Sequence, residues 1–212
     1  MSGLVMKDLC VLRRVAKTYL AIIVIYAALS MTGMWSADFF AGIMTVLVAM
    51  LPINVFSWDN AARWDGYCMA LPVRRSRVVA ARYVVALLAL AEAAVLSLAM
   101  GGVLMALGQV ADWEQYAISV GGTALGGCLL NALTMPILYK VGPERGRVAV
   151  FAVFGGTAVV VFLAAKAGAF DGLDALPQPS VAAILGVMVL IGAALLTVSY
   201  LVSCWIYQRK EV

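Results

Sequence analysis

Long apolar runs alternate with short polar connections along the whole chain. Each of six runs has the length and apolar content of a membrane-spanning helix, since about 20 apolar residues are needed to cross the hydrocarbon core. The predicted spans cover about residues 18–35, 39–57, 78–107, 118–138, 148–165 and 181–207. The connections hold no sizeable soluble domain. The pattern therefore predicts an all-α polytopic membrane protein with six transmembrane helices in one domain, residues 1–212.

The segment ahead of the first predicted span, residues 1–17, mixes apolar and basic residues at roughly helical spacing. Leu9 and Leu12, for example, fall among Lys7 and Arg13. This pattern predicts an amphipathic helix that lies in the membrane interface with its basic side chains toward the headgroups. The alternative is a charged flank that only retains the first span. No convincing cleavage site follows the first run, so we expect an uncleaved span.

The basic residues are distributed unequally between the two sides of the membrane. All Lys and Arg except Lys166 lie at the termini or around the connections after the second and fourth spans. The positive-inside rule therefore predicts that both termini and these two connections are cytoplasmic. Acidic residues such as Asp38 and Asp112 fall in the outer connections. Because membrane topology accounts for the positive charge, we expect no nucleic acid partner.

The composition agrees with a membrane protein and excludes several kinds of chemistry. Hydrophobic residues make up 65% of the chain and charged residues 12%, about half the charged share of a globular domain. The chain has no histidine, which excludes hydrolases and metalloproteases that need a His base or ligand. The four cysteines form no CxxC pair, so we expect no metal site. No GxxxxGK(S/T) loop is present, so we expect no enzyme activity and no cofactor on this chain.

Three polar residues inside the predicted spans are candidates for a substrate pathway. Glu92 is the acidic residue deepest in apolar sequence, and Asn54 and Asn131 lie in the second and fourth spans. An ionisable side chain in a membrane is costly, so Glu92 is a candidate for a substrate contact or a proton carrier. The alternative for all three is hydrogen bonding between packed helices. Pro52 and Pro136 predict bends in the second and fourth spans.

The connection between the second and third spans is unusually rich in aromatic and charged residues. Residues 58–72 predict a short amphipathic helix, which Pro72 ends before the third span. Such a helix, lying parallel to the membrane, is suited to transmit a movement of a soluble partner to the membrane spans. The residues that we assign to this contact are Arg63, Trp64, Asp65, Tyr67, Leu71, Pro72, Arg74 and Arg75.

Three stretches of the chain resemble one family. The pattern W-x-x-Y-x-x-x-L-P-V-x-R-x-x-V-V-x-x-R-Y, read from Trp64 to Tyr83, resembles the cytoplasmic loop of six-span ABC transporter permeases of the type-2 exporter class. PILYKVGPERGR, from Pro136 to Arg147, is similar to the family's loop between the fourth and fifth spans. SCWIYQRKEV, from Ser203 to Val212, is similar to its basic C-terminal end. One departure is Arg74, where the family commonly has a helix-capping Ser.

The resemblance implies a complete transport assembly. Two permease chains, identical or related, would pair in a bacterial plasma membrane above two ATPase subunits that bind ATP and Mg²⁺. Residues 1–17 would be the family's elbow helix and residues 58–72 its coupling helix. The expected cargo is an amphipathic or hydrophobic molecule, with a peptide toxin or antimicrobial favoured. The alternatives are a membrane scaffold or sensor that transports nothing, and a proton-coupled secondary transporter that uses Glu92.

Overall fold

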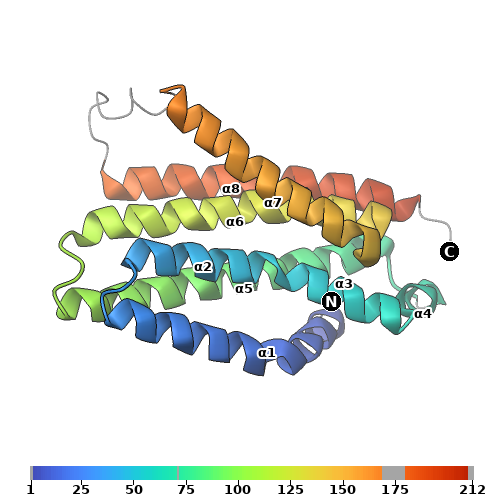
Figure 1. Ribbon diagram of the computed structural model, residues 1–212. Helices are drawn as coiled ribbons and strands as arrows, with labels where there is room; N and C mark the ends of the chain where they lie inside the picture. Colours follow the sequence, from blue (N-terminus) through green and yellow to red (C-terminus); the bar gives the residue numbers. More distant parts are fainter. Residues whose placement is uncertain (1, 71, 169–179, 210–212) are drawn as a thin grey trace.

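The chain is an elongated bundle of helices (Figure 1). The computed structural model describes residues 2–70, 72–168 and 180–209, and in these residues it contains eight helices and no strand. The helices are α1 (Ser2–Met31), α2 (Ala37–Ala49), α3 (Leu51–Ala61), α4 (Trp64–Ala70), α5 (Arg75–Ala106), α6 (Trp113–Val141), α7 (Pro143–Lys166) and α8 (Val181–Gln208). The described residues are thus all-helical, which confirms the expected all-α class and is consistent with a helical membrane protein.

The start of α1, the short helix α4 and the end of α8 all lie at one end of the bundle, which we call the α4 end (Figure 1). Hydrogen bonds confirm this arrangement: Lys7 donates to Asp59 on α3, and Arg75 on α5 donates to the backbone oxygen of Gln208. The turns that join α1 to α2 and α5 to α6 lie at the opposite end. The long helices thus run back and forth between the two ends of the bundle.

Within the described residues, four helical segments are long and apolar enough to cross a membrane: Ala37–Ala61, Arg75–Ala106, Trp113–Val141 and Val181–Gln208. The apolar part of α7, Phe151–Ala164, is shorter. In α1, the stretch without charged residues begins only at Thr18, and the helix ends at Met31. The structure therefore shows a multi-pass helical protein, and the count of six spans stays a prediction.

Two boundaries differ from the expectation. Residues 1–17 are continuous with the first predicted span, because α1 is one helix from Ser2 to Met31. Its first part runs in a different direction from the rest (Figure 1), and its place in the membrane interface stays a prediction. The second predicted span, by contrast, is divided at Met50 into α2 and α3. Pro52 accounts for the division, since its ring displaces the preceding turn and it has no N–H to continue the helix.

Pro136 lies inside α6, yet α6 runs unbroken from Trp113 to Val141. A proline leaves the carbonyl four residues earlier without its usual helical donor. That carbonyl belongs to Ala132, and the Ser199 hydroxyl of α8 donates to it at 2.6 Å. A side chain from a neighbouring helix thus satisfies the freed backbone group, as is common in membrane helices.

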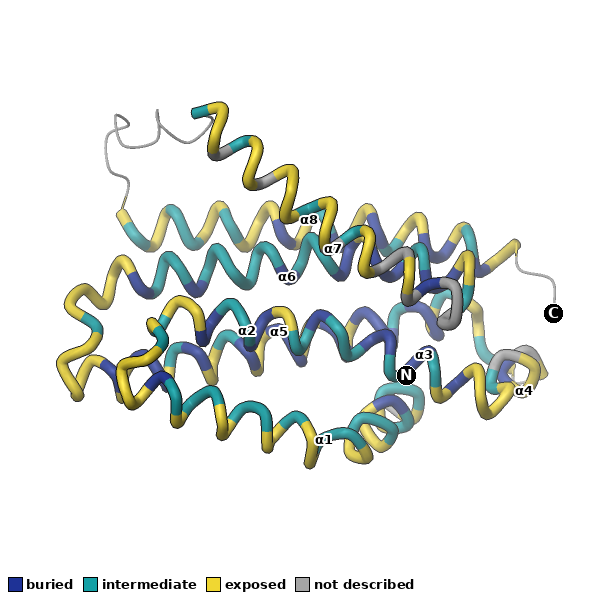
Figure 2. Tube along the Cα trace, viewed as in Figure 1, coloured by how far each residue is buried: buried dark blue, intermediate teal, exposed yellow. Residues whose placement is uncertain are grey.

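The largest of the three clusters of buried apolar side chains found in the described residues lies nearer the α4 end. Tyr83 on α5 bonds Ser199 at 2.6 Å and Ser203 at 2.8 Å, both on α8. The outer helices differ from this core: Figure 2 shows α7 exposed along most of its length, and its exposed side chains include Phe151, Val160 and Phe162. An apolar surface of this kind suits lipid or another subunit rather than water.

Candidate functional site

A sharp corner connects the second membrane segment to α5 at the α4 end. Helix α3 ends at Ala61, and Arg63 adopts a left-handed backbone conformation with φ of 49°. Helix α4 then runs only from Trp64 to Ala70. The predicted coupling helix, residues 58–72, is therefore divided, because residues 58–61 continue α3 and the left-handed turn redirects the chain.

The two faces of α4 have different environments. Trp64 and Cys68, one turn apart, pack against the hydrophobic core, and Cys68 is 5% exposed. Tyr67 points outward and is 62% exposed, with its ring 5.4 Å from that of Trp64. Of the predicted docking residues on α4, Tyr67 is therefore available to a partner, whereas Trp64 fixes the helix to the bundle.

A charge cluster of Lys7, Asp8, Asp59 and Arg82 lies behind α4. Lys7 Nζ lies 2.8 Å from both carboxylate oxygens of Asp59 and 2.8 Å from Asp8 Oδ1. Arg82 also donates to Asp59. Asp8 is 2% exposed and Arg82 5% exposed. Buried charges are tolerated only when paired and hydrogen-bonded, so this cluster fixes the relative positions of α1, α3 and α5.

Aromatic rings surround the two cations of the charge cluster. The Arg82 guanidinium lies 3.9 Å from the centre of the Phe56 ring and 5.8 Å from that of Tyr139 on α6. Lys7 Nζ lies 4.4 Å from the centre of the Trp64 ring. Cations are attracted to ring faces by about 2 kcal/mol when desolvated. Through Lys7 and Trp64, the charge cluster is therefore joined to α4 as well.

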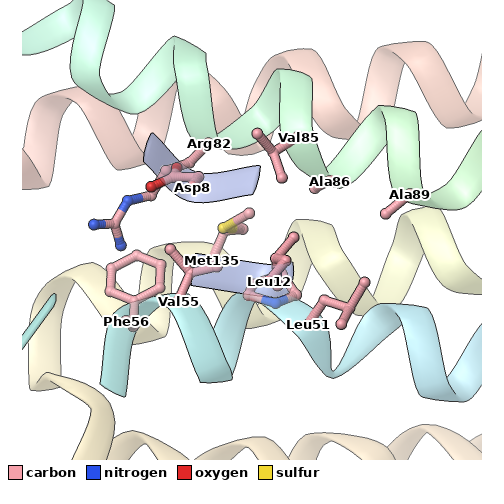
Figure 3. A pocket seen from close by; sticks show the side chains of 11 residues that line it. Asp8, Leu12, Leu51, Val55, Phe56, Arg82, Val85, Ala86, Ala89 and Met135 are labelled. Atoms are coloured by element: carbon pink, nitrogen blue, oxygen red, sulfur yellow. The ribbon is translucent and has the colours of Figure 1, made fainter. Parts of the chain in front are cut away.

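A small cavity adjoins the charge cluster, lined by Asp8, Phe56, Arg82 and apolar neighbours (Figure 3). Its volume of about 20 Å³ has room for little more than one water molecule, which needs about 10–15 Å³. The described residues contain no group of three metal-ligating side chains. This cavity is therefore too small to hold a substrate.

The basic residues assigned to the corner have separate environments. Arg75 donates to the backbone oxygen of Gln208 at 2.6 Å, where a cation also favours the negative end of α8. Arg74 is the N-cap residue of α5 and makes no side-chain cap. Arg63, Pro72 and Arg74 are exposed. Leu71 and the side chain of Asp65 lie outside the described part of the structure.

The three predicted pathway residues are not brought together in one site. Asn54 donates to the Tyr19 hydroxyl at 3.1 Å and so joins α3 to α1. Asn131 is buried and donates to Gly127 within its own helix at 3.1 Å. Glu92 is exposed and lines a separate groove between α1 and α5. Asn54 and Asn131 thus make hydrogen bonds within the bundle, and Glu92 has a different environment.

Sequence reasoning missed the charge cluster. From the sequence, Arg82 counts only among the basic residues of the cytoplasmic side, and Lys7 belongs to the basic side chains of the predicted interfacial helix. Two signals were present: Asp8 is acidic within a basic segment, and Asp59 and Arg82 carry opposite charges on the two sides of the corner. Neither signal identifies the partner, because Lys7 and Asp59 are 52 residues apart in sequence.

The sequence of nearly the whole chain matches one protein family. No curated protein and no solved structure shows detectable similarity to it. The family described as ABC-2 family transporter protein matches residues 3–208, which includes every helix of the structure apart from the first residue of α1. The match also includes the corner, the charge cluster and the exposed helix α7. This chain therefore belongs to the ABC-2 transporter family and is a permease of that type.

Proposed function

We propose that this chain is the membrane permease subunit of an ATP-driven ABC exporter and is coupled to a separate ATPase through α4. Permeases of its family generally work with an ABC ATPase. The observation that carries the proposal is the two-sided environment of α4. Tyr67 is exposed to a partner, while Trp64 contacts Lys7 of the charge cluster.

In this proposal, ATP and Mg²⁺ bind to the partner ATPase and not to this chain. Closure of the ATPase displaces α4, and the Trp64–Lys7 contact transfers the displacement to the charge cluster. Since Asp59 is bonded to both Lys7 and Arg82, α1 and α5 move together with α3. The membrane domain then changes its access, as a two-state element biased by contacts that differ between nucleotide states.

A second permease chain, identical or related, would complete the pathway. The support for it is the apolar surface of α7, where Phe151, Val160 and Phe162 are all more than half exposed. The cavities between helices are lined mainly by apolar side chains, which favours an amphipathic or hydrophobic cargo such as a peptide toxin or antimicrobial. The proposed location is the bacterial plasma membrane, with both termini in the cytoplasm.

The test reconstitutes the chain in proteoliposomes with a candidate ABC ATPase, chosen as a neighbouring reading frame that contains a GxxxxGK(S/T) loop, and measures vanadate-sensitive ATP hydrolysis. Tyr67→Ala should weaken association with the ATPase, because it removes an exposed contact. Trp64→Ala should retain association but lower hydrolysis that depends on the permease, because it loosens α4 from the charge cluster. Trp113→Ala, which alters an exposed aromatic residue of α6, should change neither.

Two results would contradict the proposal and favour one of the alternative functions. A co-purified ATPase whose turnover does not depend on this chain would indicate a scaffold or sensor. Transport driven by a pH gradient, without any ATPase, would indicate a proton-coupled transporter.

A further inference from the structure

A lateral groove between α1 and α5 adjoins the small cavity of the charge cluster. The two share Leu12, Leu51, Val85 and Ala89. The groove has a volume of about 230 Å³, and its walls come from α1, α2, α3 and α5. Apart from Arg13, Tyr19 and Glu92, every lining side chain is apolar. An engineered apolar cavity of about 150 Å³ holds benzene, so this groove has room for part of a hydrocarbon chain.

Glu92 lies near the middle of the membrane segment of α5. It follows Arg75 by 17 residues (92 − 75) and precedes Ala106 by 14 (106 − 92), which places it about 26 Å and about 21 Å from the two helix ends. A charged side chain at such a depth costs roughly 2.5–3.5 kcal/mol even on insertion scales. Glu92 lines an open groove at this depth. A ligand with a positive charge in the groove would offset this free-energy cost by pairing with the carboxylate.

The other polar groups of the groove are differently placed. The Tyr19 hydroxyl accepts a hydrogen bond from Asn54 at 3.1 Å. Arg13 follows Asp8 of the charge cluster by five residues (13 − 8), whereas Glu92 follows Arg82 of that cluster by ten (92 − 82). Arg13 therefore lies nearer the α4 end than Glu92 does. No ion pair in the described part of the chain joins Glu92 to a basic side chain.

We propose that the lateral groove binds a cationic amphiphile, whose positive group pairs with Glu92 and whose hydrocarbon part lies along Leu20, Ile23, Leu88 and Leu96. The carboxylate selects against an anionic amphiphile by like-charge repulsion. The inference that cationic amphiphiles are the substrate class of the exporter rests on the proposed function. Their binding to the groove requires no ATPase. The apolar walls that the groove shares with the charge-cluster cavity place a bound ligand against α1, α3 and α5, the helices that the charge cluster joins.

The test uses the purified full chain in nanodiscs without ATPase or ATP. Fluorescence anisotropy, corrected with empty nanodiscs, measures the binding of a dye-labelled alkyl quaternary ammonium probe. A matched alkyl sulfonate with the same chain and dye reports the effect of charge. The wild-type chain should bind the cationic probe at least tenfold more tightly than the anionic probe, a difference of about 1.4 kcal/mol.

The variants assign this preference to the groove. Glu92→Gln keeps the shape of the side chain and should weaken cation binding at least tenfold, while Glu92→Asp keeps the charge and should retain the preference. Ala16→Phe, which fills the groove, should abolish binding. Glu114→Gln removes an exposed carboxylate at the opposite end of the bundle and should bind as wild type.

Equal affinity for the two probes, or wild-type affinity in both Glu92→Gln and Ala16→Phe, would overturn the inference. Those results would show that the probe stays in the lipid or that a second chain covers the groove. If Glu92→Gln fails to fold, the charge preference of the wild-type chain and the effect of Ala16→Phe still test whether the groove binds the cationic probe. Failure of ATPase coupling with intact probe binding would remove the proposed function and leave the groove as a binding site.

Discussion

The charge cluster gives the sharpest prediction for stability. Arg82→Met retains much of the apolar stem but removes the guanidinium from Asp59, which is 7% exposed. Removing one partner of a buried ion pair costs about 3–5 kcal/mol. Because Lys7 still bonds both carboxylate oxygens at 2.8 Å, we expect the lower end, a loss of about 3 kcal/mol in the free energy of unfolding.

Asp59→Asn should be similarly destabilising, because it leaves both Lys7 and Arg82 with a weaker partner. The double variant removes one charge of each sign, so its loss should be smaller than the sum of the single losses by about 2 kcal/mol, within the range for side chains in contact. The assay is equilibrium unfolding of the full chain in detergent micelles, followed by far-ultraviolet circular dichroism.

Arg77→Met is the matched control, since Arg77 is an exposed arginine on the same helix. Combined with Asp59→Asn it should give additive losses, within about 0.5 kcal/mol. If the Arg82 and Asp59 losses are equally additive, the two side chains do not stabilise each other, and the proposed transfer of motion through the cluster is refuted.

Two further predictions concern packing within the membrane, and both are measured by thermal unfolding in detergent. Gly101→Ala should be destabilising by about 1–3 kcal/mol, because the added Cβ would overlap the Tyr116 ring. Gly102→Ala should be tolerated, because its added Cβ would have nothing within 4 Å. Equal losses of stability in the two variants would contradict this packing. Ser199→Ala should cost more than Ser203→Ala, because the Ser199 hydroxyl also donates to the Ala132 carbonyl that Pro136 leaves without its usual helical donor. Leaving a buried acceptor unsatisfied costs about 1–3 kcal/mol, so a Ser199→Ala loss no larger than the Ser203→Ala loss would contradict this contact.

Hydropathy predicted the helical membrane class well because a bilayer leaves few choices to the backbone, which must satisfy its own hydrogen bonds. It did not predict which proline breaks a helix. Pro52 and Pro136 give the same local signal, yet only Pro52 separates two helices. At Pro136 the freed carbonyl accepts a hydrogen bond from Ser199, which lies 63 residues further along the chain (199 − 136 = 63), and sequence spacing alone does not reveal that contact.

The corner shows a second limit. Residues 58–72 were correctly expected to contain a helix apart from the spans, but its bounds and its buried face were not predictable. A helix as short as Trp64–Ala70 has too few turns for periodicity to separate two faces that both carry aromatic rings. Trp64 is turned inward by Lys7 and the core. The contacts of Trp64 with Lys7 and with the core depend on the tertiary fold, and single-sequence patterns do not specify it.

The contact of α4 with an ATPase is tested most directly by site-specific photo-crosslinking in native membranes. Benzoylphenylalanine replaces Tyr67, which is 62% exposed, and in a separate variant replaces Trp113, which is 38% exposed on α6. The account predicts a crosslink to an ABC ATPase from position 67 and none from position 113. Absence of an ATPase crosslink from position 67, or an equal crosslink from position 113, would contradict it.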